Sequence, residues 1–426
     1  MSVMKKILWL LILLIAFQTL RAGFDDFFLK QSLRVDYYHS GNAGSEFFSL
    51  KTLLHEPFWG GSLNQLVDTM NFGNHKVEVY DLAEGKLIYS RGYSSLFAEW
   101  QTTAEAKLVI KTFEESALIP FPKNPVLFRI CSRDSTGVFT NRFEMKINPN
   151  DYFIRPAGSQ KWPVADIHIS GDPATSVDIV VIPDGFRASE MDLFLQKASD
   201  FARYLFQFEP YAGHSNKFNI RAVLAVSDSS GVAVPAEGFW PETVVSSSFY
   251  TFDSERYCMT TAHHRLRDIA ALAPYDQIYI LTNTTKYGGG GIFNFYCLSS
   301  ALNQSSPEII VHEFGHGFAG LADEYYDSST SYESFYELTL EPWEPNITTL
   351  VDFASKWQDL LKPETPVPTP DSAEWEGVTA VFEGGGYTAK GMYRPSRDCL
   401  MHTFKGKVFC AACNRAIERM IDFYTK

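Results

Sequence analysis

Residues 311–326, which read VHEFGHGFAGLADEYY, constrain what this chain can form more than any other segment. His312, Glu313 and His316 follow the pattern H-E-x-x-H within it. Residues four apart on an α-helix lie on one face, so both imidazoles can contact one metal ion. Glu313 lies beside that face and can reach a metal-bound water. The spacing therefore predicts a helix that carries two metal ligands and a general base.

The flanking residues favour a metal site over an ordinary helix with hydrogen-bonded histidines. The apolar residues 309–311 would bury the opposite face of the helix, and Gly320 stands where a helix ends in a left-handed cap. Asp323 and Glu324 follow this turn, where the returning chain can offer a carboxylate as third ligand. Zinc with three protein ligands lowers the pKa of its bound water toward neutrality. We therefore predict one catalytic Zn²⁺ here.

The bulk composition is that of a globular protein with more than one domain. The chain has 426 residues, of which 45% are hydrophobic and 20% charged, and this length favours two domains. A formal net charge of −13 argues against nucleic acid or an anionic membrane surface as a partner. The oligomeric state does not follow from the composition.

The first 22 residues have the pattern of a cleavable export signal. Lys5 and Lys6 precede the apolar residues 7–17, and Ala22 offers a small residue before Gly23. The apolar run is short for a membrane span, although a retained anchor is the alternative. We expect a periplasmic, cell-surface or secreted protein whose mature chain has no stable membrane insertion.

The two halves of the remaining chain differ in their hydrophobic patterning. Alternating segments such as KVEVY at 76–80 predict a β-sandwich over residues 23–160, with a structural or substrate-presenting role. Over residues 161–426, apolar strands at 177–182, 218–226 and 277–281 alternate with helical segments at 189–206 and 266–272. This indicates a two-domain α+β or α/β protein. The second domain would hold a mixed sheet and the active-site helix, and Ser189 would cap the first helix.

Two further segments carry weaker signals. Residues 287–292 read YGGGGI, and Gly289 and Gly290 would let an edge strand lie close to an extended peptide; a flexible loop is the alternative. Residues 327–390 are polar and rich in proline, especially 363–370. We predict extended linker or lid material at 363–370, outside the core, and no particular structure for the rest of the segment.

The six cysteines agree with an oxidising compartment. Cys131 stands alone, whereas Cys258 and Cys297 flank the middle of the second half and are candidates for a disulfide. Cys399 would pair with either Cys410 or Cys413. The C-x-x-C spacing of the last two is also typical of a redox pair or a structural zinc site, but no second such pair is present.

With these motifs in hand, the chain resembles the IgA peptidase family of secreted metallo-endopeptidases. The resemblance is carried by HEFGHGFAGLADEY at 312–325, VVIPDGF at 180–186, YGGGG at 287–291, and FEGGGYTAKGMYRPSRDCLM at 382–401 followed by FCAAC. It implies a metzincin-like zinc peptidase, in which a methionine lies beneath the metal, here Met401. The glycine and the acid come one residue later than in the usual metzincin spacing. This points to Asp323 as third ligand, with Glu324 as the alternative.

The leading hypothesis is an exported zinc endopeptidase that hydrolyses polypeptide or glycoprotein with a zinc-bound water, Glu313 being the general base. The developing oxyanion needs a further donor, and Tyr393, Arg394 and Tyr325 are the candidates. The physiological substrate does not follow from the family. The rival hypothesis is an exported glycan- or protein-binding protein with a vestigial zinc peptidase fold.

Overall fold

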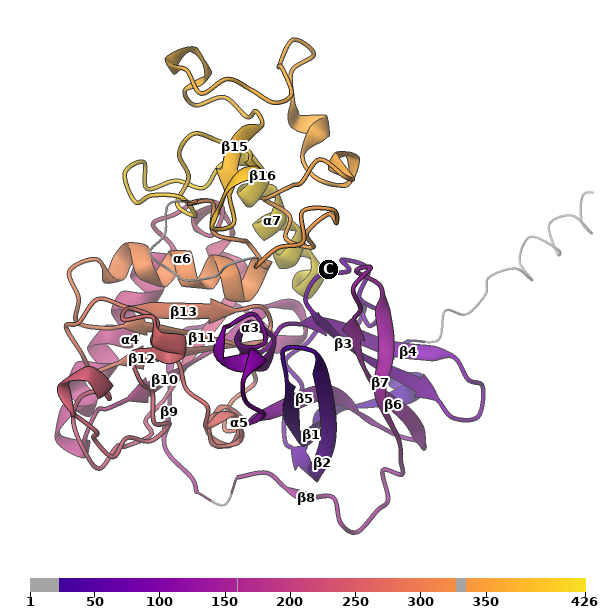
Figure 1. Cartoon of the computed structure of the whole chain (residues 1–426). Helices are drawn as coiled ribbons and strands as arrows, with labels where there is room; N and C mark the ends of the chain where they lie inside the picture. Colours follow the sequence, from indigo (N-terminus) through magenta and orange to yellow (C-terminus); the bar gives the residue numbers. More distant parts are fainter. Residues whose placement is uncertain (1–22, 159, 327–334) are drawn as a thin grey trace, which may run out of the picture.

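The computed structural model describes residues 23–158, 160–326 and 335–426, which form two β-rich parts side by side (Figure 1). The predicted export signal, residues 1–22, lies outside the described residues, as do residues 327–334. No helix within the described ranges is long and apolar enough to cross a bilayer.

The N-terminal part consists of two four-stranded sheets. Their strand orders are β5-β1-β2-β8 and β4-β3-β6-β7, and neighbouring strands are antiparallel except β2 and β8. Val35, Val79 and Phe128 come from both sheets and are buried in one apolar cluster, as the alternating pattern predicts. The strands are β1 (Phe28–Asn42), β2 (Ser45–Glu56), β3 (His75–Asp81), β4 (Leu87–Tyr93), β5 (Lys111–Pro122), β6 (Val126–Arg133), β7 (Phe139–Ile147) and β8 (Arg155–Pro156). Two short helices, α2 (Phe24–Phe27) and α3 (Leu96–Trp100), accompany them.

The second part is built on a six-stranded mixed sheet with the order β13-β14-β12-β10-β11-β9. Four central strands run parallel and the two edge strands are antiparallel to them. Every residue of β10 is buried, because helices cover both faces of a parallel sheet. The strands are β9 (Val164–His168), β10 (Val177–Asp184), β11 (Phe218–Val223), β12 (Gln277–Thr282), β13 (Gly289–Ile292) and β14 (Tyr296–Ser300).

Helices lie on both faces of this sheet. The helices are α4 (Met191–Leu205), α5 (His263–Ala270), α6 (Ser306–Ala319) and α7 (Ala411–Thr425). Residues of α4, α6 and α7 share one apolar cluster with one face of β10, and α5 shares another cluster with the opposite face and with α3 of the N-terminal part. The predicted Ser189 cap is wrong: Glu190 accepts the backbone N–H of Arg187 at 2.8 Å instead, just before α4 begins.

The proline-rich segment is more ordered than the sequence predicts. Trp357 is fully buried in the main core, and its indole N–H donates to the carbonyl oxygen of Ala380 at 2.8 Å. The hairpin β15 (Phe382–Gly385) and β16 (Thr388–Arg394) follows. Trp357 and its neighbour Phe353 therefore belong to the main core. Most of residues 363–370, the predicted linker or lid, is exposed, apart from Thr365 and Thr369.

Candidate metal centre

Helix α6 carries the H-E-x-x-H residues. Its apolar side, which includes Phe314 and Phe318, packs into the main core, and the other side lies against β13 (Figure 1). The side chains of His312 and His316 are 12% and 15% exposed. The helix ends at Gly320, whose φ of +64° and ψ of 30° are left-handed, as predicted.

Three ligand atoms converge after this turn. Nε2 of His312 and of His316 lie 3.1 and 3.4 Å from Oδ1 of Asp323, and 3.2 Å from each other. Tetrahedral zinc with ligands at about 2.0–2.2 Å places neighbouring ligand atoms roughly 3.3–3.5 Å apart. The three residues that the sequence predicts to bind one metal ion are thus close enough to do so.

Hydrogen bonds at the far side of each ring fix which nitrogen faces the centre. Nδ1 of His312 donates to the carbonyl oxygen of Leu400 at 3.0 Å, and Nδ1 of His316 donates to that of Leu321 at 2.5 Å. In neutral rings, both Nε2 lone pairs then point at the same place as the Asp323 carboxylate. Three facing electron pairs fit a cation, and this pattern of backbone partners is typical of metal-ligating histidines.

The electrostatics of the centre follow from burial and from the mutual contacts. Burial opposes ionisation of Asp323, but His316 and His312 outweigh it and hold the pKa of its carboxyl well below the usual range. Burial likewise disfavours the charged imidazolium, yet Asp323 raises the pKa of His316 to about 9. Oδ2 of Asp323 accepts the hydroxyl of Tyr387 at 2.5 Å. Asp323 is thus held as an anion with one oxygen facing the two histidines.

Glu313 lies between α6 and the glycine strand β13. A Cβ atom at Gly289 would be 3.0 Å from Glu313 Oε1, and one at Gly291 would be 2.2 Å from the Glu313 carbonyl oxygen. Burial raises the pKa of the Glu313 carboxyl, although His312 and His316 oppose this. A proton-accepting group therefore stands beside the centre.

The turn that contains Met401 lies beneath the helix. Met401 is fully buried, and its sulfur would be 3.0 Å from a Cβ atom at Gly315, which lies between the two histidines on α6. The carbonyl oxygen of Leu400 accepts from His312, and that of Met401 accepts from the Glu324 N–H at 2.8 Å. Met401 thus packs directly against the part of α6 that lies between the two histidines.

Comparison with known protein families identifies the family of the chain. The profile described as IgA Peptidase M64 matches residues 165–379 and 371–421. A second profile, Peptidase M64 N-terminus, matches residues 23–144. The chain belongs to the IgA peptidase M64 family. No curated protein matches it. The M64 chain is therefore a peptidase, and its substrate is polypeptide.

The candidate metal centre of this M64 peptidase lies in a cavity of about 1850 Å³ that both parts of the chain line. Of the predicted oxyanion donors, Tyr325 lines the cavity. Tyr393 and Arg394 are not among the described lining residues: Arg394 is buried, with Nη1 donating to the carbonyl oxygens of Glu383 and Gly384, both at 2.8 Å. The assignment of an oxyanion role to these two residues does not fit the structure.

The glycine strand of the peptidase is an edge strand, but its outer side is partly occupied. The backbone N–H of Gly289 donates to the carbonyl oxygen of Arg256, and the carbonyl oxygen of Gly289 accepts from the backbone N–H of Cys258 at 3.3 Å. A Cβ atom at Gly290 would be 2.3 Å from the sulfur of Met259. At Gly289, therefore, the strand is not a free edge for substrate. The glycines are required because α6 and residues 256–259 pack so closely.

Several cavity residues carry no sequence signal. Glu99 of α3 reaches the cavity from the N-terminal part and accepts the hydroxyl of Tyr257, and burial raises its pKa to about 7. Arg256 and Tyr387 line the same space. No local pattern marks these positions, because only the packing of the two parts brings Glu99 to the centre.

The predicted disulfides are wrong. All six cysteines are free and buried. Cys258 is fully buried, and Cys297 donates its thiol to the carbonyl oxygen of Glu313. Cys399 and Cys413 have their sulfur atoms 3.8 Å apart, whereas a disulfide requires about 2.05 Å.

Proposed function

We propose that this M64 peptidase is an exported, zinc-dependent endopeptidase of metzincin-like design, with a signal peptide at residues 1–22. The observation that carries the proposal is the convergence of two imidazole nitrogens and one carboxylate oxygen within 3.1–3.4 Å. His312, His316 and Asp323 would hold the ion. When bound, zinc supplies Lewis acidity, which activates water and polarises the scissile carbonyl group.

Glu313 is the general base in this proposal. Its carboxylate takes a proton from the attacking water and delivers it to the nitrogen of the leaving amine. A raised pKa suits a group that must both accept and donate a proton near neutral pH. Tyr325, which lines the cavity, is the predicted donor to the developing oxyanion.

The open cavity supports a polypeptide substrate rather than a small molecule. Its volume of about 1850 Å³ exceeds the roughly 300–1,000 Å³ of typical small-ligand pockets. The N-terminal β part contributes Glu99 and Gln101 to the wall. In this proposal that part helps to select the substrate, in addition to its structural role.

The test replaces the proposed base, Glu313, and leaves the three proposed metal ligands unchanged. Glu313→Gln should lower kcat/KM on an unfolded protein substrate by about 10²–10⁴-fold, because the proton acceptor is lost, with zinc content unchanged. Glu308→Gln is the matched control, since Glu308 lies on the same helix and pairs with Lys407. It should retain activity. Equal cleavage by the Glu313 variant and the wild type would contradict the proposal.

A further inference from the structure

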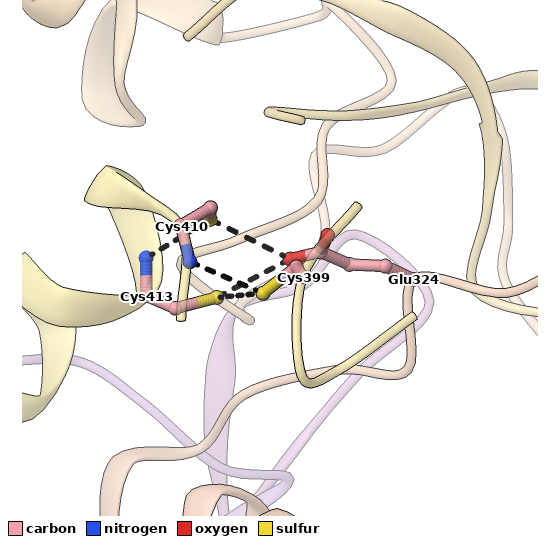
Figure 2. Close-up of side chains that lie close together, drawn as sticks. All are labelled: Glu324, Cys399, Cys410 and Cys413. Carbon is pink, nitrogen blue, oxygen red and sulfur yellow. Dashed lines mark hydrogen bonds between the residues drawn. The ribbon is translucent and has the colours of Figure 1, made fainter. Parts of the chain in front are cut away.

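A second cluster of residues that could hold a metal ion lies apart from the histidines. Glu324, Cys399, Cys410 and Cys413 are buried, with at most 9% exposure, and their ligand atoms all lie within 4.8 Å of one another. Figure 2 shows the sulfur atoms and the Glu324 carboxylate gathered at one point. They come from three segments: the chain after Gly320, the turn before Met401, and the start of α7.

The distances within this thiol cluster match those between the ligands of one tetrahedral ion. Zinc–sulfur bonds of about 2.3 Å place two sulfur ligands roughly 3.8 Å apart, and a sulfur and an oxygen ligand roughly 3.5 Å apart. The sulfur atoms of Cys399 and Cys413 are separated by 3.8 Å. Oε1 of Glu324 lies 3.2 Å from the sulfur of Cys413 and 3.8 Å from that of Cys410.

Backbone donors favour thiolates in this cluster. Cys410 is the N-cap of α7, and its sulfur accepts the N–H of Cys413 at 3.5 Å. The N–H of Cys410 in turn donates to the sulfur of Cys399 at 3.3 Å. The positive end of a 15-residue helix and two N–H donors stabilise negative sulfur.

Glu324 supplies the second, independent observation. Its carboxylate is fully buried, and within the described residues Oε2 has no hydrogen-bond partner. Apart from the thiols, Oε1 accepts from Asn346 at 3.0 Å. A buried carboxylate that faces three sulfur atoms is costly to hold without a cation. A disulfide would use two of the sulfurs and leave both Cys410 and Glu324 unexplained.

We propose that Glu324, Cys399, Cys410 and Cys413 bind a second zinc ion, which is structural. Three thiolates and a carboxylate complete a closed tetrahedral set, and thiolate ligands select zinc over magnesium or calcium. The sequence argument against structural zinc, the lack of a second C-x-x-C pair, fails because Cys399 and Glu324 complete the set. The ion fastens the Leu400–Met401 turn and the start of α7 to the chain after Gly320.

In this proposal two neighbouring residues bind two different ions: Asp323 faces the histidines, and Glu324 faces the thiols. This coupling rests on the proposed function, whereas the thiol site stands without it. The two sites differ in ligand chemistry, so their metals can be told apart by spectroscopy.

The experiment measures zinc content and cobalt spectra of the exported chain, prepared under reducing conditions. The wild type should hold two zinc ions per chain. The His312→Ala/His316→Ala variant should hold one, and with cobalt it should show thiolate-to-cobalt charge-transfer absorption. Cys410→Ala should lose that absorption, whereas Cys131→Ala, a buried cysteine of the N-terminal part, should keep it.

The wild type and the histidine variant decide the outcome even if the Cys410 variant fails to fold. A histidine variant without zinc and without charge-transfer absorption would overturn the proposal. A Cys399–Cys413 disulfide, found by peptide mapping of the wild type, would overturn it as well. A failure of the proposed function alone would give a different result. The thiolate-to-cobalt absorption would remain, but the histidine substitutions would change neither zinc content nor proteolysis.

Discussion

At the residue scale, the position of Asp323 shows how a change in motif spacing is reflected in the structure. The inserted residue after His316 moves the acid from position 322 to Asp323, and Ala322 is instead held by two hydrogen bonds with Asn346. Alternation along an extended chain predicts that Glu324 points away from Asp323, and it does. The convergence of His312, His316 and Asp323 was therefore predictable from sequence.

The hydroxyl of Tyr387 should tune the metal centre through Asp323. Removing it with Tyr387→Phe leaves Oδ2 without its 2.5 Å donor, so the carboxylate is held less firmly. We expect zinc affinity at the histidine site to fall by about 10–100-fold, as for other partners of metal ligands. Competition with a chelator measures this. Tyr393→Phe is the control and should have no effect; equal losses in both variants would rule out a specific role.

Glu99 should make stability depend on pH. Its folded pKa of about 7 lies above the ordinary 4.5, so the unfolded chain releases this proton first as pH rises. Folded stability should therefore fall between about pH 4.5 and 7 and stay constant above that range. Glu99→Gln removes this loss, so the variant should exceed the wild type by about 1–3 kcal/mol at pH 8 and match it near pH 4. Urea unfolding at both pH values tests this, and a pH-independent difference would refute it.

The donor to the oxyanion could not be read from the sequence. Tyr393 and Arg394 sit in a motif that favoured them, yet the pairing of β15 with β16 directs Arg394 toward the backbone of Glu383 and Gly384. The register of this hairpin includes an irregularity between Glu383 and Gly385, which no local pattern shows.

At the scale of elements, the glycine strand and the active-site helix form one unit. The run of glycines predicted an edge strand that could lie close to an extended peptide. In the structure the glycines instead allow close packing against α6 and residues 256–259. A Cβ atom at Gly291 would lie 2.2 Å from the backbone of Glu313. The close approach brings Glu313 to the strand, and only the assembled structure reveals it.

A methyl group at Gly291 should push strand β13 and helix α6 apart. Gly291→Ala cannot be accommodated by a side-chain rotation, because the obstacle is backbone, so the strand or the helix must shift. We expect a loss of about 1–3 kcal/mol in the free energy of unfolding, together with reduced activity. Denaturant unfolding gives the value. Gly44→Ala, where the nearest atom is 3.9 Å away, is the matched control and should change little.

At the scale of the whole molecule, the sequence predicted the order of the parts better than their contacts. Period-two alternation gave the N-terminal sheets, and strands alternating with helices gave the mixed sheet, because these patterns are local. The contribution of α3 to the cavity, the burial of Trp357 and the meeting of Glu324 with three cysteines depend on contacts between distant segments. Contacts between segments far apart in the chain cannot be inferred from composition or motif spacing.

The proposed zinc centre is tested most sharply by X-ray diffraction from zinc-loaded crystals on both sides of the zinc absorption edge. If His312, His316 and Asp323 bind zinc, an anomalous peak lies between Nε2 of His312, Nε2 of His316 and Oδ1 of Asp323. Absence of a peak there in fully loaded protein, or a peak with Asp323 turned away from it, would rule out this zinc site.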